Sequence, residues 1–314
     1  IYINQTMTEP IVRVENLSHR YSVQWAVKDI NLEIAGRGIF GLLGSNGAGK
    51  STIMNIICGV LKQTAGDVFI KGIDMRRNPI EAKKHIGFLP QKPPLHLDLT
   101  VEEYLIYSAD LRMIPEKEVK AAVENVLTSC GIAHFRKRLI KNLSGGYQQR
   151  VGIAQAIIHN PDIVVLDEPT NGLDPNQIVE IRSLIRDIAQ DRTVVLSTHI
   201  LSEVQALCDN IRMIESGKVV FSGTVEEFDN YIIPNTVFVS LLEAPPVGEI
   251  AKLEGVTEVT ETGGNGYKVK FTDSQEAIES IVAASVKNGW RLSEIRLERS
   301  SLDTIFAELS KKAK

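Results

Sequence analysis

Short apolar blocks alternate with helical patterns over the first two thirds of the chain. Ile39–Leu43 is an apolar run that leads into a glycine-rich turn. The apolar residues after this turn have the spacing of a helix packed on a sheet, and they are Ile53, Ile56, Ile57 and Val60. Two further runs, Ile163–Leu166 and Thr193–Ser197, also have the pattern of buried strands. Strands that alternate with helices in this way predict an α/β fold.

The strand pattern fades after Pro93. Thr100 and Glu103 have the spacing of a capping box at the start of one helix, and Glu116–Ser129 predicts a second helix. We therefore expect a helical subdomain, over about residues 93–160, that is inserted into the α/β core.

The pattern changes again in the last third of the chain. The predicted order is strand, helix, strand, strand, helix, strand, helix, over Thr236–Leu242, Val247–Leu253, Val256–Glu261, Tyr267–Thr272, Glu276–Asn288, Arg291–Glu298 and Leu302–Leu309. Asn265-Gly266 predicts a tight hairpin between the two middle strands. Asp273 and Ser300 are expected to be helix N-caps, and Asn288-Gly289 to end a helix. This order is the split βαβ, ferredoxin-like pattern.

Length and composition agree with two domains that each have a core. The chain has 314 residues, of which 43% are hydrophobic and 24% are charged. We expect an α/β domain over residues 1–230 and an accessory α+β domain over residues 231–314. The 35 basic and 39 acidic residues leave a net charge of −4, which argues against a general nucleic-acid binder. No apolar run approaches the ~20 residues that cross a bilayer. Cys58, Cys130 and Cys208 are too far apart for a zinc site and are expected to be buried.

A phosphate-binding loop pattern lies at Gly44–Ser51, between the predicted strand and the helix after it. Its glycines let backbone N–H groups turn toward phosphates, and the following helix presents the positive end of its dipole. We expect Lys50 to reach the β- and γ-phosphates and the Ser51 hydroxyl to ligate Mg²⁺. The residues expected to bind nucleotide here are Gly44, Ser45, Asn46, Gly47, Ala48, Gly49, Lys50, Ser51 and Thr52.

Asp167 and Glu168 come directly after the apolar strand Ile163–Leu166. A carboxylate at the tip of a buried strand beside a phosphate-binding loop can hold Mg²⁺ through water. Glu168 is then placed to polarise an attacking water. The alternative is an ordinary acidic turn before Pro169, and the nearby phosphate-binding loop favours the functional interpretation.

The segment Leu143–Arg150 opens a second helix with an anion-binding start. Ser144, Gly145 and Gly146 lie at that start, where free backbone N–H groups can bind an anion. A chain with one phosphate-binding loop does not by itself account for a second such helix. At this segment the sequence resembles the ATP-binding subunits of ABC transporters, in which this signature completes the site of the opposing subunit. One position differs, because Tyr147 stands where the family usually has Gln.

The resemblance covers about residues 11–225 and implies further site residues in the family's order. Tyr21 corresponds to the aromatic residue that stacks on adenine, and Gln91 to the glutamine that senses Mg²⁺ and the permease. Asp174 belongs to the loop that crosses the dimer interface in that family. His199 corresponds to the histidine that contacts the γ-phosphate.

These correspondences imply an assignment of roles. Glu168 and His199 are implied to be catalytic, with ATP and Mg²⁺ as cofactors. The implied metal site consists of Ser51, Gln91 and Asp167. The implied protein is a peripheral, cytoplasmic ATPase subunit on the inner face of the cell membrane, which dimerises with a second ATPase subunit and powers a separate integral-membrane permease.

The detail of two segments narrows the resemblance to the type-2 export family, closest to gliding-motility-associated and drug- or lipid-export subunits. The segments are Gly146–Gly152 and Asp174–Gln177, and the C-terminal element at Ser301–Phe306 is similar to that group as well. The alternative is a soluble ABC-type ATPase that acts in macromolecular assembly without a permease. Co-purification with a membrane subunit discriminates between the two hypotheses.

Overall fold

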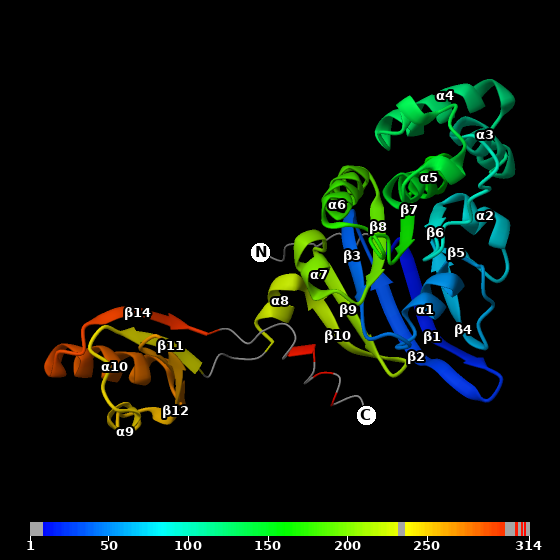
Figure 1. Ribbon diagram of the computed structural model, residues 1–314. Helices are drawn as coiled ribbons and strands as arrows, with labels where there is room; N and C mark the ends of the chain where they lie inside the picture. The colour runs from blue at the N-terminus through cyan, green and yellow to red at the C-terminus, as the bar shows by residue number, and fades with distance from the viewer. Residues whose placement is uncertain (1–8, 232–235, 299–304, 307–308, 310, 312–314) are drawn as a thin grey trace, which may run out of the picture. The chain divides into compact units, whose positions relative to one another are not determined.

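The computed structural model describes residues 9–231, 236–298, 305, 306, 309 and 311 (Figure 1). The chain divides into two compact units, and it passes from the first to the second between Val225 and Glu226. The sequence pattern puts this boundary a few residues later, near residue 230. The helix predicted over Leu302–Leu309 and its expected N-cap at Ser300 lie mostly or wholly outside the described residues.

A six-stranded sheet forms the centre of the first unit. Its strands, in sheet order, are β10 (Lys218–Thr224), β9 (Asn210–Glu215), β3 (Gly38–Leu43), β8 (Thr193–Thr198), β7 (Ile163–Asp167) and β6 (Ile86–Leu89). All neighbouring pairs are parallel except β10 with β9. Every residue of β7 and β8 is buried, as expected for parallel strands covered on both faces. The carboxyl ends of β3, β8 and β7 lie side by side.

A second, antiparallel sheet was not evident in the sequence pattern. It has the order β2-β1-β4-β5, from β1 (Val12–Tyr21), β2 (Gln24–Ile34), β4 (Ala65–Ile70) and β5 (Ile73–Asp74). The pairing of β1 with β2 shifts register in three places, which interrupts the alternation that predicts a strand. Side chains of both sheets and of the helix α1 (Lys50–Ile57) share one hydrophobic core.

The remaining helices of the core follow the strands. They are α2 (Pro79–Lys84), α5 (Gly145–Ile157), α6 (Pro175–Ala189) and α7 (Leu201–Leu207), while α8 (Val225–Asp229) spans the division between the two units. In α1 the predicted apolar stripe is confirmed at Ile53, Ile56 and Ile57, which are buried. It is wrong at Val60, which is 66% exposed, because the helix ends at Ile57 and Gly59 then takes a positive φ of 64°.

The helical insertion has the two helices that the sequence predicts, α3 (Val101–Leu111) and α4 (Glu116–Ser129). The capping box is confirmed: Thr100 Oγ1 accepts from Glu103 N at 3.3 Å, and Glu103 Oε2 accepts from Thr100 N at 2.8 Å. In Figure 1 these helices and α5 gather at the end of the first unit away from β1 and β2.

The second unit has an order of strands and helices typical of a split βαβ topology. Its elements are β11 (Thr236–Leu241), α9 (Val247–Ile250), β12 (Val256–Gly263), β13 (Gly266–Phe271), α10 (Ser274–Asn288) and β14 (Leu292–Leu297). The sheet is antiparallel, with the order β12-β13-β11-β14. One face of this sheet packs on α10 around a core that includes Tyr267 and Trp290.

The β12–β13 hairpin differs by one residue from its prediction. Gly263 pairs with Gly266, so the two-residue turn is Gly264-Asn265, with φ angles of 59° and 61°. Gly266 belongs to the ladder, where a Cβ atom would come within 3.1 Å of the Phe238 ring. The predicted N-cap Asp273 is confirmed, since it accepts from Gln275 N and Glu276 N.

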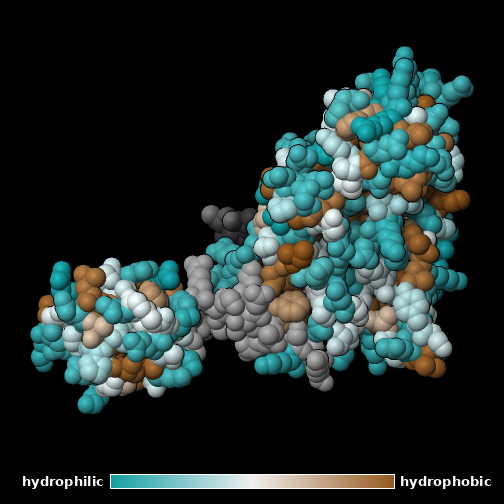
Figure 2. All heavy atoms as spheres, in the orientation of Figure 1, coloured by the Kyte–Doolittle hydropathy of each residue, from teal (hydrophilic) through white to brown (hydrophobic). Residues whose placement is uncertain are grey.

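Polar side chains dominate the faces of both units that Figure 2 shows, with apolar residues in scattered patches. In the part of the chain that the structure describes, no helix combines the length and the hydrophobicity needed to cross a membrane. Cys58, Cys130 and Cys208 are free and buried, as expected from their spacing.

Candidate active site

The phosphate-binding loop joins β3 to α1 in a tightly packed turn. A Cβ atom on Gly44 would lie 2.2 Å from the Ile214 carbonyl oxygen, so only glycine fits there. Gly49 caps α1 with a φ of 111°. The Lys50 ammonium bridges the loop by donating to the carbonyl oxygens of Gly44 at 2.9 Å and Ser45 at 3.1 Å. The turn therefore keeps its curved shape, with the N-terminus of α1 at its open side.

Asp167 ends β7 beside the first turn of α1. Its Oδ1 accepts from the Ser51 hydroxyl at 3.2 Å and from the Ser197 hydroxyl of β8. Mg²⁺ prefers oxygen ligands and is usually bound by one or two protein groups together with substrate phosphates. The hydroxyl of Ser51 and the carboxylate of Asp167 fit this donor set.

Glu168 is held in an unusual backbone conformation next to Asp167. Its φ is 48°, a left-handed value that costs a non-glycine residue energy. Its N–H donates to the Ser197 carbonyl oxygen and hydroxyl, at 3.2 and 3.1 Å. Its Oε1 lies 3.0 Å from His199 Nδ1 and 3.8 Å from Lys50 Nζ. The carboxylate is thus fixed between an imidazole and an ammonium group.

Electrostatics at Lys50 follow from this crowding. Burial lowers the pKa of the Lys50 ammonium, and the neighbouring carboxylates of Glu168 and Asp167 oppose that shift. The two carboxylates therefore favour the charged form of a lysine that is 4% exposed.

A cavity of 670 Å³ opens over these groups. Of the sequence-predicted site residues, its lining includes Tyr21, Asn46, Gly47, Gly49, Lys50, Ser51, Thr52, Gln91, Glu168 and His199. Tyr21, at the end of β1, is 54% exposed and can offer its ring face to a ligand. Five separate chain segments therefore meet at one opening.

The predicted residues at the second anion-binding helix start, and Asp174, lie elsewhere. Ser144 is the N-cap residue of α5, is exposed, and makes no side-chain cap hydrogen bond. Gly146 packs so closely on Gln177 that a Cβ atom would lie 2.7 Å from the Gln177 side chain. Asp174 caps α6 by accepting from Gln177 N at 3.0 Å. The starts of α5 and α6 thus lie together, outside the lining of the cavity.

Several residues in and around the site were missed at the level of sequence. Ser197 binds both Asp167 and the Glu168 backbone, and Glu215 accepts from Ser45 Oγ at 3.0 Å. Trp25 and Asn171 also line the cavity. Only Ser197 had a usable signal, because polar residues at the carboxyl ends of adjacent parallel strands meet at one edge of the sheet.

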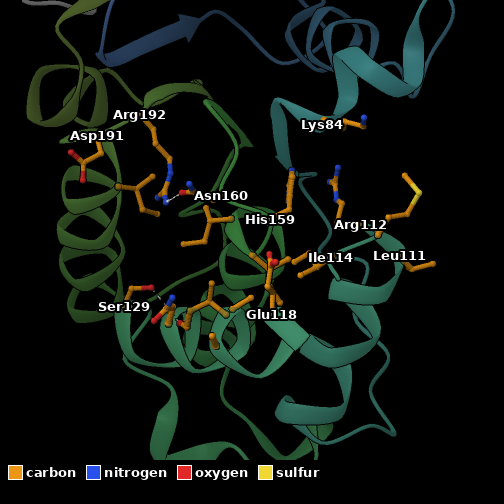
Figure 3. A pocket seen from close by; sticks show the side chains of 18 of the residues that line it. Lys84, Leu111, Arg112, Ile114, Glu118, Ser129, His159, Asn160, Asp191 and Arg192 are labelled. Carbon is orange, nitrogen blue, oxygen red and sulfur yellow. Dashed lines mark hydrogen bonds between the residues drawn. The ribbon is translucent and has the colours of Figure 1, made fainter. Parts of the chain in front are cut away.

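A larger cavity, of 1330 Å³, lies between the helical insertion and the core of the first unit (Figure 3). Arg112 and Glu118 of the α3–α4 region line it, together with His159 and Asn160 after α5 and Arg192 before β8. It contains neither a phosphate-binding loop nor a carboxylate at a strand end, so the smaller cavity is the candidate active site.

The chain is similar to known proteins over its whole length or its first unit. A family model described as ABC transporter matches residues 27–171. The bacitracin transport ATP-binding protein BcrA of Bacillus licheniformis is 38% identical over 212 residues, covering 67% of this chain and 68% of BcrA. The daunorubicin resistance ATP-binding protein DrrA3 of Streptomyces coeruleorubidus is 29% identical over 306 residues, 97% of each chain. The solved structure of cbiO1 from Clostridium perfringens, part of the ABC transporter complex cbiONQ, aligns with a TM-score of 0.64 and 31% identity, over 70% of this chain and 90% of cbiO1.

Proposed function

The chain belongs to the ATP-binding proteins of the ABC transporter family, and we propose from this premise that its 670 Å³ cavity binds and hydrolyses ATP with Mg²⁺. The contacts of Glu168 carry the proposal. A carboxylate fixed between His199 Nδ1 and Lys50 Nζ, at 3.0 and 3.8 Å, stands at the mouth of a phosphate-binding loop. That is the position from which a carboxylate can accept a proton from an attacking water.

Each of the other groups has one task in this proposal. Lys50 leaves the loop carbonyls to bind the β- and γ-phosphates, and the N–H groups from Gly47 to Thr52 bind phosphate oxygens at the start of α1. Ser51, Asp167 and Gln91 would hold the Mg²⁺ ion. When bound, Mg²⁺ neutralises charge on the phosphates. Tyr21 stacks on the base.

His199 orients the carboxylate and reaches the γ-phosphate. Its side chain is partly exposed and borders the cavity, while the Glu168 side chain is buried. Because Nδ1 faces Glu168, the Nε2 side of the ring is free to face the substrate. Glu168 and His199 are therefore proposed as the catalytic pair.

The signature residues are proposed to act in trans. Ser144, Gly145 and Gly146 lie outside the cavity, and the exposed N-terminus of α5 is suited to bind phosphate. Two copies that face each other, each with its signature over the other's bound ATP, complete two sites. Asp174 at the start of α6 then lies at the interface. A homodimer formed by ATP is the proposed active state.

The cavity beneath the helical insertion is proposed as the docking site for a cytoplasmic helix of a separate permease. Three apolar side chains at its rim are exposed: Ile80 at 68%, Leu111 at 64% and Met113 at 68%. Arg112, whose guanidinium donates to the Lys83 and Ile86 carbonyl oxygens, lies between them. Apolar contacts around a cationic group suit an amphipathic helix.

We propose that the transporter is an exporter of the type-2 family, with this subunit on the inner face of the membrane. DrrA3, a daunorubicin resistance protein, aligns with both units of this chain, whereas the BcrA alignment spans 212 residues. The second unit, as an accessory domain, is therefore shared with at least one drug-resistance protein.

Phosphate release from Mg-ATP by the purified full chain tests the enzymatic proposal. We expect steady turnover that stops when EDTA removes the metal. Turnover that is indifferent to EDTA contradicts the Mg²⁺ assignment, and no turnover at any protein concentration contradicts ATP hydrolysis by a homodimer.

Crosslinking in membranes tests the transport proposal. Cysteine introduced at Met113 is expected to crosslink to an integral-membrane partner, and cysteine at Leu97, also on the insertion and 47% exposed, tests how far the docking surface extends. Val286 on α10, 80% exposed, provides the control position. Crosslinks from Val286 alone contradict docking at the insertion, and co-purification with only soluble proteins favours an assembly ATPase.

A further inference from the structure

Glu203 of α7 is the most deeply buried acidic side chain beside the active site, and none of the roles above uses it. It is 2% exposed. A buried carboxylate is costly unless hydrogen bonds compensate for the lost water. The donors that surround Glu203 therefore show what the structure uses it for.

Two threonine hydroxyls donate to this carboxylate. Thr198 Oγ1 donates to Oε2 at 2.6 Å, and Thr170 Oγ1 donates to Oε1. The nearest cation, the Arg182 guanidinium of α6, is 3.8 Å from Oε1, and the Arg182 Nε has no hydrogen-bond partner among the described residues. The carboxylate is thus held chiefly by two neutral hydroxyl groups from two different segments.

Each threonine belongs to a segment that carries a proposed catalytic residue. Thr170 lies two positions after Glu168, and its carbonyl oxygen accepts from Leu173 N in the turn that leads to α6. Thr198 directly precedes His199. The contact between Glu168 and His199 links these two segments at the cavity. Glu203 links the same two segments through Thr170 and Thr198.

We propose that Glu203 is a positioning residue for ATP hydrolysis, which clasps the Glu168 and His199 segments together through Thr170 and Thr198. The inference rests on the proposed function of that site. The clasp keeps His199 Nδ1 within hydrogen-bond reach of Glu168 Oε1 while the left-handed backbone at Glu168 remains strained. It touches neither nucleotide nor metal, so it sets the catalytic geometry and leaves nucleotide affinity to the phosphate-binding loop.

The clasp uses both oxygens of one carboxylate as acceptors. The Thr198 hydroxyl accepts from Ile200 N at 3.0 Å while it donates to Oε2. In Glu203→Gln the side-chain carbonyl oxygen can still accept from one threonine, but the NH₂ group can only donate, so the other hydroxyl must turn to accept. The substitution keeps the size of the side chain, removes its negative charge and reverses one hydrogen bond of the clasp.

Steady-state kinetics of the full chain test the proposal. In Glu203→Gln we expect kcat to fall about tenfold, as for one buried hydrogen bond that is reversed and loses its charged acceptor, with KM for ATP within about twofold. Thr198→Val should do the same, and Thr198→Ser, which keeps the hydroxyl, should retain the rate. The double variant Glu203→Gln, Thr198→Val should be no slower than about the worse single variant, because the two residues act as one unit. Glu33→Gln, an exposed glutamate of β2, is the matched control.

A readout independent of turnover separates this inference from the proposed function. The His199 imidazole resonances, followed by NMR, should shift in Glu203→Gln and remain in place in Glu33→Gln. If the unsubstituted chain releases no phosphate but the resonances shift, the proposed function fails and the clasp is supported. The proposed clasp is overturned if Glu203→Gln leaves kcat unchanged or leaves the His199 resonances in place. It is also overturned if kcat falls together with an equally large rise in KM and a lower melting temperature.

Discussion

Polar groups lie both at the strand ends beside the cavity and at the start of α5, but the two regions differ in how far these groups are hydrogen-bonded within the chain. At the strand ends and the first turn of α1, hydrogen bonds within the chain join Ser51, Asp167, Ser197 and Glu168. At the start of α5, the Ser144 side chain is exposed and makes no cap hydrogen bond to its helix. Ser and Asn side chains at this position normally cap the helix.

This difference indicates which part of the proposed site a single chain can preorganise. Groups buried at strand ends lose little freedom when substrate binds, because packing already fixes them. An exposed helix start gains a partner only when another molecule supplies one. Substitutions near the strand ends are therefore expected to impair ATP binding or hydrolysis, whereas substitutions at the start of α5 are expected to impair dimerisation.

Lys50→Ala should have the largest effect, because it removes the cation of the preorganised phosphate-binding loop. Loss of two or three charge-assisted contacts to phosphate, at about 1.5–3 kcal/mol each, should weaken ATP binding by more than about 100-fold. Calorimetric titration with Mg-ATP measures it. Lys62→Ala, an exposed lysine, is the control. Unchanged ATP affinity in Lys50→Ala contradicts the phosphate-binding loop assignment.

Glu168→Gln should separate binding from chemistry. The amide is isosteric but cannot accept a proton from water, so turnover should fall by about 100-fold or more while ATP affinity stays close to that of the unsubstituted chain. With Mg-ATP this variant should accumulate as a dimer on size-exclusion chromatography, because hydrolysis no longer separates the copies. Turnover near the unsubstituted rate would show that Glu168 is not the base.

Ser144→Arg, made in the Glu168→Gln background, tests the role of the start of α5 in dimerisation. A long cationic side chain at the open start of α5 should weaken ATP-dependent dimerisation about tenfold or more while each monomer still binds ATP. Analytical ultracentrifugation with Mg-ATP measures the association constant. Thr128→Arg, at an exposed position of α4, is the control and should dimerise normally. Equal dimerisation of the two arginine variants argues against a shared site.

The smallest effect concerns the opposite end of α5, where burial lowers the pKa of His159 to about 4. Its Nε2 lies 3.0 Å from the Ile86 carbonyl oxygen, and its Nδ1 has no partner among the described residues, so protonation would bury an N–H without an acceptor. The unfolded chain binds this proton near pH 6.5 and the folded chain only near pH 4. Stability from this residue is therefore present above pH 6.5 and is lost as the pH falls toward 4.

His159→Gln removes this titration. Between pH 7 and pH 5 the unsubstituted chain should lose about 1–2 kcal/mol more stability than the variant. Urea unfolding followed by circular dichroism at the two pH values measures the difference, and His134→Gln, at an exposed position, is the control. An identical pH dependence of the unsubstituted chain and His159→Gln contradicts the lowered pKa of His159.

Features set by near neighbours in the chain were predictable. The capping box of Thr100 and Glu103, the N-cap Asp273, the helix stop at Gly289 and the helix Glu116–Ser129 all match the structure. Each depends on contacts within about four residues or on the backbone freedom of one glycine. The phosphate-binding loop was found for the same reason, since its function resides in a continuous segment.

Predictions that depended on distant pairing were less complete. The antiparallel sheet around β1 was missed because its register shifts hide the alternation, and the hairpin turn was placed one residue late because strand pairing fixes its register. Glu203 and Glu215 had no local pattern, and Ser197 was marked only by its place at the end of a predicted strand. The separation of Ser45 from Glu215 is 170 residues, and that of Thr170 from Glu203 is 33.

Sequence patterns alone indicated the candidate residues for the chemistry: the loop around Lys50, the carboxylates Asp167 and Glu168, and the start of α5 at Ser144. Tertiary packing places Glu168 between Lys50 and His199 and keeps the start of α5 outside the lining of their cavity. The physical reason is that residue type and local backbone propensity are written in consecutive positions. Which side chains share a cavity depends instead on the order and register of parallel strands, and the buried core fixes both.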